Sequence, residues 1–562
     1  MRKGLLVGLS TFWAVACSSS TQPKLAPCTA ASAGQLSLAV AGYTAIDPTQ
    51  TAGCAVFGTN PSAAALQYLL VPQAVSGVPD DASGFLLLGA TVPAAAARFA
   101  PARSGTAPVL SPQHQFDLTL RRAERELASR VGQPSRPQAV APLARLPPML
   151  GDRRVFKVCG NSDCTTHPAV VAFARNVGTH IAVFQDSVDE ANGRALSTAN
   201  LDTLRLLFDT LLYAADTSAF GRESDIDNNG VVIVLMTGKV NSLVPSPCTG
   251  GYIGGYFYGG DLLPPSQFNP APNLSEIFYS IVPDPLGTLS CVHSAAGVKN
   301  SVPGTFIHEF QHMISFNQHV LLRRSRTGED LWLNEGLSHY AEEMGARLFL
   351  PGDSTPFCYF IAGDLYNSAQ YLAAPESRVL VDTSGIGGLE NRGAYWLFVR
   401  FLVDQFSSDT TRLANNVVTR ALDRTTFTGA VNVTNATGTP FATVVQRWAL
   451  ANYVSDLPTF TAPPELQYMR WRFRTDYRTI HDACIPRTQP NPPPYPSAYP
   501  LFPASGDGSA INLAGTLHSG SGSYYLAQQP AGAVGFTLLF SNSTGYALRA
   551  SLAPRLNVLR LQ

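Results

Sequence analysis

Charge is scarce in this sequence. Charged residues make up 14% of its 562 residues, and the 39 Lys and Arg residues balance the 39 Asp and Glu residues, whereas about 25% charged residues is typical of soluble proteins. Because a nucleic-acid-binding protein needs a basic surface, this composition gives no support for a nucleic-acid partner. After residue 20 the sequence also lacks an apolar run of the about 20 residues that cross a bilayer as a helix. It has no C-x-x-C motif, which argues against a zinc ribbon or a thioredoxin-type site.

The first residues, MRKGLLVGLSTFWAVACSSS, predict export. A basic start precedes an apolar segment, residues 4–16, that is too short to span a bilayer. The sequence AVAC, which ends at Cys17, resembles the lipobox of bacterial lipoproteins, in which the cysteine is lipidated and anchors the mature chain to a membrane. Ser18 favours the outer membrane or the cell surface as destination, and residues 18–27 form a tether. An ordinary signal peptide at 1–17, with release from the cell, is the alternative.

The other cysteines are even in number, as expected for disulfides in an exported chain. Nine cysteines less Cys17 leave eight. The sequence does not determine their connectivity. Pairing each with its sequence neighbour predicts four disulfides: Cys28 with Cys54, Cys159 with Cys164, Cys248 with Cys291, and Cys358 with Cys484.

Composition and apolar patterning divide the chain into several regions. Strand-like runs between turn residues dominate both ends, and strand-like and helical runs alternate in the middle, which is typical of an α+β domain. The length predicts more than one domain and leaves the oligomeric state open. The predicted regions are a β-rich, sandwich-like domain at 28–110, a helix with a Pro-rich linker at 111–150, the α+β domain at 151–484, a second Pro-rich linker at 485–503, and a β-rich domain at 504–562.

The stretch FIHEFQHMISF, residues 306–316, contains H-E-x-x-H. On a helix His308 and His312 project from the same face because they lie four residues apart. Two such histidines can hold a catalytic zinc ion, which takes three protein ligands and binds a water whose pKa falls to about 7. Glu309 can then act as general base on that water. Two unrelated histidines on a surface helix are the alternative.

Three residues compete to be the third zinc ligand. A metzincin motif does not continue here, because Ser315 stands where glycine is needed and Gln318 where the last histidine belongs. Glu335, in LWLNEGLSHYAEE, begins a second helical segment that can fold back beside the first, and it is the favoured ligand. His339, one turn after Glu335, and His319, one residue out of the metzincin register, stay open.

Three further features accompany the motif. A ligand histidine usually gives its other ring nitrogen to a carboxylate, and Glu342 or Glu343 could provide one, although a solvated helix face is the favoured interpretation of both. Tyr395, in GAYWLFVRF, is a candidate donor for the oxyanion of the reaction, with packing in the core as the alternative. The glycine-rich GGYIGGYFYGG, residues 250–260, could be a strand beside the substrate or a hairpin.

The sequence DIDNNG resembles the first half of an EF-hand calcium loop. Asp225, Asp227 and Asn229 stand at its first, third and fifth positions, and Gly230 at the sixth. The twelfth position, where an EF-hand has a bidentate glutamate, is Met236. A calcium site and a turn that introduces the next strand both remain open.

Together HEFQHMISF, LWLNEGLSHYAEE and GAYWLFVRFLVDQF resemble the hyicolysin family of bacterial zinc metallopeptidases, as do DIDNNGVVIVLMTGKVN and EIFYSIVPDPLG upstream. The resemblance covers roughly residues 110–455. It implies His308 and His312 as zinc ligands, Glu309 as catalytic base and Glu335 as third ligand, in the manner of gluzincins.

The fold expected from these features is multidomain, with an α+β zincin-like catalytic domain between β-rich N- and C-terminal domains. The function expected is that of an exported, lipid-anchored zinc endopeptidase that acts on proteins or peptides. An aminopeptidase of the same class is one alternative, although the G-x-M-E-N sequence of such enzymes is absent. A catalytically inactive surface-binding lipoprotein is another, although the base Glu309 is present.

Overall fold

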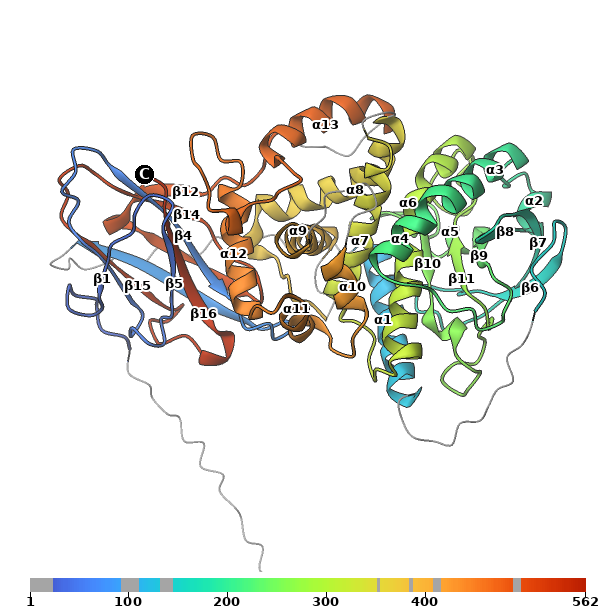
Figure 1. The fold of residues 1–562 in the computed structure, drawn as a ribbon, viewed down its shortest axis with the longest axis horizontal. Helices are drawn as coiled ribbons and strands as arrows, with labels where there is room; N and C mark the ends of the chain where they lie inside the picture. The colour runs from blue at the N-terminus through green and yellow to red at the C-terminus, as the bar shows by residue number, and fades with distance from the viewer. Residues whose placement is uncertain are drawn as a thin grey trace, which may run out of the picture.

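The computed structural model describes residues 24–91, 111–131, 145–350, 354–383, 388–407, 416–488 and 497–562. The predicted signal peptide and Cys17 lie outside the described residues. Within the described ranges, no helix is both long and apolar enough to cross a membrane. Figure 1 shows three regions side by side: a β-sandwich, a group of helices, and a region of sheet and helices. The chain therefore has the multidomain, mixed α and β structure that the sequence predicts.

The two ends of the chain form one β-sandwich. Its sheets have the strand orders β1-β3-β15-β5-β13 and β12-β14-β4-β16-β2. The rings of Phe57 and Tyr68 meet between the sheets, with centroids 5.0 Å apart. The strands are β1 (Gln35–Leu36), β2 (Tyr43–Ile46), β3 (Cys54–Phe57), β4 (Leu66–Ala74), β5 (Ala82–Thr91), β12 (Ala504–Asp507), β13 (Asn512–His518), β14 (Tyr525–Gln529), β15 (Phe536–Asn542) and β16 (Pro554–Arg560).

This arrangement corrects the prediction of separate β-rich domains at 28–110 and 504–562. Strand β4 pairs on one side with β14 and on the other with β16, and β5 lies between β13 and β15. Each segment therefore depends on the other for the partners of its apolar strands. Blue strands from the N-terminal segment and red strands from the C-terminal segment accordingly lie together in the sandwich in Figure 1.

A six-stranded sheet lies at the other end of the molecule, with the order β10-β11-β9-β8-β7-β6. Its strands β8, β9 and β11 are parallel neighbours, and β10 pairs antiparallel with β11 at the edge. Strand β9 reads VIVLM and is buried throughout, as expected for a strand covered on both faces. The strands are β6 (Arg153–Lys157), β7 (Ala169–Val177), β8 (Ile181–Asp186), β9 (Val232–Met236), β10 (Gly255–Phe257) and β11 (Ile277–Ser280).

Helix α6 packs on this sheet and connects it to the helical region. Phe306 of α6 contacts Phe278 of β11, with ring centroids 5.2 Å apart. The helices that follow α6 pack beside one another and extend to the sandwich (Figure 1). The helices after α1 are α2 (Ser187–Ala191), α3 (Thr198–Leu207), α4 (Tyr213–Ala219), α5 (Gly238–Asn241), α6 (Ala295–Phe316), α7 (Leu331–Arg347), α8 (Ser354–Ala373), α9 (Leu389–Phe406), α10 (Val417–Asp423), α11 (Gly429–Thr437), α12 (Phe441–Val454) and α13 (Phe473–Thr488).

Helix α1 (Pro112–Val131) packs against the edge strand β10 of the six-stranded sheet. Phe116 is 1% exposed, and its ring lies 5.1 Å from that of Tyr256 in β10. Leu120 and Ala128 are also buried. The sequence predicts this helix together with a linker at 111–150, outside the α+β domain. In the structure its apolar face is part of the core of the 151–484 region.

All four predicted disulfides are present. Cys28 is bonded to Cys54, Cys159 to Cys164, Cys248 to Cys291, and Cys358 to Cys484. The neighbour pairing is therefore confirmed.

Candidate metal centre

Helix α6 carries both histidines of the H-E-x-x-H motif. The Ser294 side chain caps the helix by accepting a hydrogen bond from the amide of Gly297, and residues 306–316 are buried without exception. Buried histidines need polar partners. His308 and His312 face each other one turn apart, with their Nε2 atoms 3.2 Å apart.

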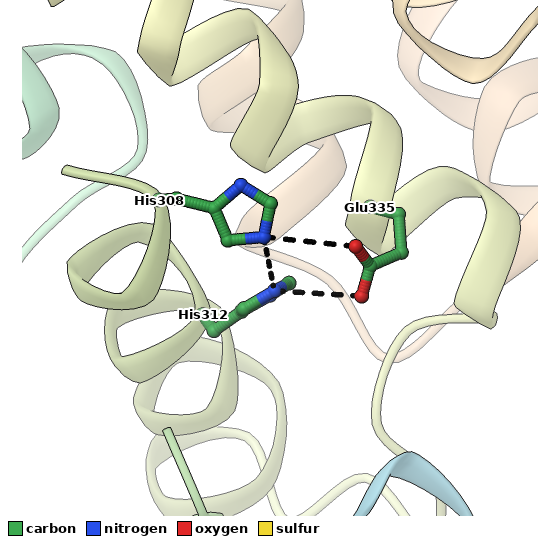
Figure 2. A group of neighbouring side chains, drawn as sticks. All are labelled: His308, His312 and Glu335. Atoms are coloured by element: carbon green, nitrogen blue, oxygen red, sulfur yellow. Dashed lines mark hydrogen bonds and ion pairs between the residues drawn. The ribbon is translucent and has the colours of Figure 1, made fainter. Parts of the chain in front are cut away.

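Helix α7 brings a carboxylate to these nitrogens. Figure 2 shows Glu335 facing both rings. Its Oε2 lies 3.6 Å from His308 Nε2, and its Oε1 lies 3.5 Å from His312 Nε2. Zinc binds nitrogen and carboxylate oxygen at about 2.0–2.2 Å in a tetrahedron, so its ligand atoms stand about 3.3–3.5 Å apart. Two imidazoles and a carboxylate at these distances fit a zinc ion.

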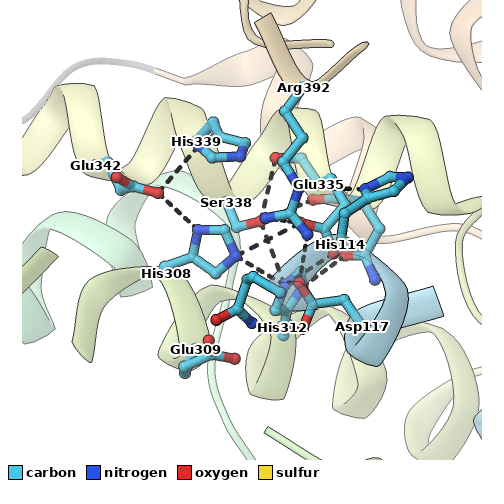
Figure 3. A network of polar contacts seen from close by, with 12 residues as sticks. His114, Asp117, His308, Glu309, His312, Glu335, Ser338, His339, Glu342 and Arg392 are labelled. Atoms are coloured by element: carbon cyan, nitrogen blue, oxygen red, sulfur yellow. Dashed lines mark hydrogen bonds and ion pairs between the residues drawn. The ribbon is translucent and has the colours of Figure 1, made fainter. Parts of the chain in front are cut away.

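The His308 ring is held on its other side by Glu342. Glu342 Oε1 lies 2.7 Å from His308 Nδ1 and 3.0 Å from His339 Nδ1 (Figure 3). His312 Nδ1 lies 3.2 Å from Asn334 Oδ1. Each histidine therefore turns Nδ1 to an oxygen and Nε2 toward Glu335, the orientation that a metal ligand requires.

The expectation that Glu342 and Glu343 lie on a solvated helix face is wrong. The Glu342 side chain is 17% exposed and contacts His308. Glu343 is fully buried and accepts hydrogen bonds from the indoles of Trp396 and Trp471. All residues of α7 other than Glu342 and Arg347 are buried, and the sequence of the helix alone does not reveal this.

The other two candidate ligands have other partners, although a ring nitrogen of His339 lies within 4.8 Å of ligand atoms of His308 and Glu342. His339 Nδ1 is held between Glu342 and Asp364, whose Oδ1 is 2.9 Å away. Although burial opposes a charge on His339, these two carboxylates raise its pKa to about 9, so the ring carries a proton. His319 lies beside Glu329 and Asp423, at 4.0 Å and 3.8 Å. The structure brings Glu335, and not His319, to the two histidines.

Glu309 lines a cavity of about 200 Å³ together with His308. Its Oε2 accepts a hydrogen bond from the amide of Phe257 in β10, at 2.8 Å. Burial raises the pKa of Glu309 to about 7. A carboxylate so placed can take up a proton at the wall of the cavity.

Tyr395 does not line this cavity. The residue is fully buried, and its hydroxyl donates to Asp382 Oδ2 at 3.2 Å. The structure thus places Tyr395 in the core, the alternative that the sequence left open, and gives no support to a role as oxyanion donor. Tyr359 of α8 and Arg392 of α9 line the cavity instead.

The sequence does not predict a set of residues around Arg392 that contacts Glu335. Arg392 Nη1 lies 3.2 Å from Glu335 Oε2, and its Nη2 forms an ion pair with Asp117 of α1. Its Nε donates to His114 Nδ1 at 3.3 Å, and burial, together with Arg392, lowers the pKa of His114 to about 3. The neutral His114 ring thus accepts a hydrogen bond from the guanidinium. Through His114 and Asp117, α1 helps to hold the Arg392 guanidinium beside Glu335 (Figure 3).

Side chains of α1 also occupy the outer edge of β10. Gln113 Nε2 donates to the carbonyl of Gly255 at 3.2 Å, and Arg121 Nη2 donates to the carbonyl of Phe257 at 2.6 Å. The amide of Phe257 is bonded to Glu309. Residues 250–260 thus provide an edge strand beside the cavity, and the carbonyls of Gly255 and Phe257 and the amide of Phe257 on its outer edge already have partners.

The structure brings Asp225 and Asp227 of the predicted calcium loop together with Glu276. One oxygen each of Asp225, Asp227 and Glu276 lie within 4.8 Å of one another. The Asn229 side-chain oxygen accepts a hydrogen bond from the amide of Val231 at 2.8 Å.

Comparison with known proteins supports a metallopeptidase. No protein-family model matches the chain. The chain is 31% identical over 137 residues to the neutral metalloprotease ShpI of Staphylococcus hyicus. This match spans 24% of the chain and 29% of the relative's own length. It is therefore a distant similarity to a metalloprotease over part of each protein.

Proposed function

We propose that the chain is an exported zinc endopeptidase. The proposal rests on one observation: the donor atoms of His308, His312 and Glu335 stand 3.2–3.6 Å apart, with Glu309 beside them at a cavity. The partial similarity to a neutral metalloprotease favours the same reaction class. The H-E-x-x-H and N-E-G-L-S motifs support membership of the hyicolysin family.

The residues divide the hydrolysis between them. His308, His312 and Glu335 would hold the zinc ion, which would lower the pKa of a bound water and polarise the substrate carbonyl. Glu309 takes a proton from the attacking water as the new C–O bond forms, and passes it to the amine as the C–N bond breaks. Glu342 keeps the His308 ring in the orientation for binding.

Tyr359 replaces Tyr395 as the candidate donor to the oxyanion. Its ring comes from α8 and lines the same cavity as Glu309. A hydroxyl at the cavity wall can donate to the oxygen of the attacked carbonyl, a role worth about 2.7–4 kcal/mol in well-studied hydrolases. The buried Tyr395 hydroxyl cannot reach that oxygen.

The cavity favours an endopeptidase over an aminopeptidase. An aminopeptidase needs a carboxylate that is free to bind the ammonium group of the substrate. Among the described residues that line the cavity, the carboxylates are Glu309 and Glu342. Both have partners within the protein, Phe257 for one and two histidines for the other.

Export is proposed on the N-terminal sequence together with the disulfides. Four disulfides are expected in an oxidising compartment and not in the cytosol. Cys17 would carry a lipid that anchors the protein in the outer membrane or at the cell surface. In this arrangement the sandwich lies between the anchor and the peptidase region.

The test uses the chain from Ser18 onward. Bound zinc is measured by mass spectrometry, and cleavage of casein is compared between the wild type, Glu309→Ala and the exposed control Glu376→Gln. We expect Glu309→Ala to keep its zinc and to lose activity by about 100-fold or more, and the control to lose neither. Full zinc occupancy with equally negligible casein cleavage in the wild type and both variants would refute the proposed peptidase activity. Unchanged zinc affinity in Glu335→Ala would refute the third ligand.

A further inference from the structure

We propose that Asp225, Asp227 and Glu276 form a calcium site that is separate from the zinc centre. The sequence DIDNNG provides the first half of a calcium loop and lacks the glutamate that closes it. The structure provides a glutamate from another strand. One carboxylate oxygen from each of the three residues lies within 4.8 Å of the other two.

The sheet explains why Glu276 reaches this loop. The loop leads into β9, and Glu276 immediately precedes β11, the parallel neighbour of β9. The amide of Ile233 donates to the carbonyl of Glu276 at 2.7 Å. Parallel pairing thus places Glu276 beside the residues that precede β9. Met236, the twelfth residue of the loop, lies in β9 itself and has no carboxylate to offer.

Two carboxylate oxygens of the cluster are buried without a hydrogen-bond partner among the described residues: Asp227 Oδ1 and Glu276 Oε2. The exposed fractions are 0% for Asp227 and 1% for Glu276. A buried oxygen without a partner is costly, and in native proteins it points to a missing ligand. This observation is independent of the loop sequence.

Three other oxygens, one from each carboxylate, are held in place by the protein. Asp225 Oδ1 accepts hydrogen bonds from the amides of Asn229 and Gly230, at 2.9 Å and 3.2 Å. Asp227 Oδ2 accepts from the Ser275 hydroxyl at 2.7 Å. Glu276 Oε1 accepts from the Ser224 hydroxyl at 2.6 Å and from the amide of Ile226 at 2.9 Å. The three carboxylates are thus oriented before any ion binds.

The charge of the cluster also calls for a cation. Among the described residues, the ion pair at the cluster joins Asp227 to Arg145: Arg145 Nη1 lies 3.6 Å from Asp227 Oδ2, and the Arg145 side chain is one-third exposed. Burial raises the pKa of Asp227, and it raises the pKa of Glu276 to about 7. Without a further cation, burial disfavours the charged form of these two carboxylates.

The donor set selects calcium among common metals. All three side chains offer oxygen, and the cluster has neither the imidazoles nor the thiolates that zinc prefers. Calcium accepts carboxylates, backbone carbonyls and waters in an irregular geometry, whereas magnesium needs a near-ideal octahedron. Oxygens from separate segments, one of them exposed, suit calcium.

The test measures binding of calcium alone to the zinc-loaded chain from Ser18, by isothermal titration calorimetry and thermal unfolding. We expect one calcium per chain, a higher Tm in calcium than in equimolar magnesium, and affinity at least about tenfold weaker in Asp227→Asn and Glu276→Gln. Glu223→Gln is the matched control, because its carboxylate lies outside the cluster and accepts from the Tyr213 hydroxyl.

Asp225→Asn is a third cluster variant, which tests the site without changing a buried side chain, because Asp225 is exposed. We expect this variant to keep its circular dichroism spectrum and its zinc while its calcium affinity falls. The proposal is overturned if the wild type binds no calcium, or if all three cluster variants bind it as tightly as Glu223→Gln. Zinc content and casein cleavage in the same samples test the peptidase separately.

Discussion

The packing of α7 against α9 should set the position of Glu335, and Gly336 tests this directly. A Cβ at Gly336 would lie 2.8 Å from the carbonyl oxygen of Tyr395 and 2.8 Å from Val399 Cγ2. Because apolar atoms pack best at about 3.5–4.0 Å, Gly336→Ala must separate the helices by roughly 0.7 Å. The obstacle includes backbone, which cannot rotate out of the way.

Two opposing effects determine the stability of this variant. Overpacking costs about 1–3 kcal/mol, and replacing a helical glycine with alanine returns about 1 kcal/mol. We expect the free energy of unfolding to fall by about 0–2 kcal/mol. Since Glu335 is the preceding residue and moves with the helix, we expect cleavage to fall by as much as about 100-fold.

Gly363→Ala on α8 is the matched control, because no atom lies within 4 Å of its added Cβ. It should raise the free energy of unfolding by about 1 kcal/mol and leave zinc binding unchanged. Urea unfolding, chelator competition for zinc and casein cleavage measure the three quantities. If Gly336→Ala matched Gly363→Ala in all of them, the α7–α9 contact would not position Glu335.

Two further predictions concern charge. Glu342→Gln removes the carboxylate 2.7 Å from His308 Nδ1, so chelator competition should show zinc affinity about 10–100-fold weaker, and an unchanged affinity would exclude this role. Burial raises the pKa of Asp423 to about 7 in the folded protein, whereas the ordinary carboxyl pKa is about 4. The contribution of the Asp423 proton to the free energy of unfolding is therefore complete below about pH 4 and is lost as the pH rises through about 7. Asp423→Asn should therefore reduce the loss of unfolding free energy between about pH 5 and pH 7.5 in urea titrations, whereas a loss equal to that of the wild type would count against this sign.

The part of the candidate site that could be predicted from the sequence is the part that depends on local geometry. His308, Glu309 and His312 lie within about one helical turn, so their relative placement follows from the period of the helix. Glu335 could be proposed because a connection of moderate length lets α7 return beside α6. The disulfides could be predicted by pairing sequence neighbours, on the expectation that the chain is exported.

The rest depends on contacts between distant segments. Asp117 and Arg392 are far apart in the sequence, and neither stands in a motif that points to the other. Glu276 reaches the calcium loop only through the pairing of β9 with β11. The roles of Tyr359 and Tyr395 depend on which helix face meets the cavity, and aromatic residues on buried helices give no signal of that.

The sandwich has a consequence for the order of folding. Strand β4, residues 66–74, pairs with β14 and β16, which span residues 525–560. The chain must therefore grow by 451 residues, 525 minus 74, before β4 meets its first neighbour. At about 5–20 residues per second this takes roughly 20–90 s of synthesis. Throughout this interval β4 has unpaired edges that can join another chain, so a chain interrupted before residue 525 should be aggregation-prone even where its peptidase region has folded.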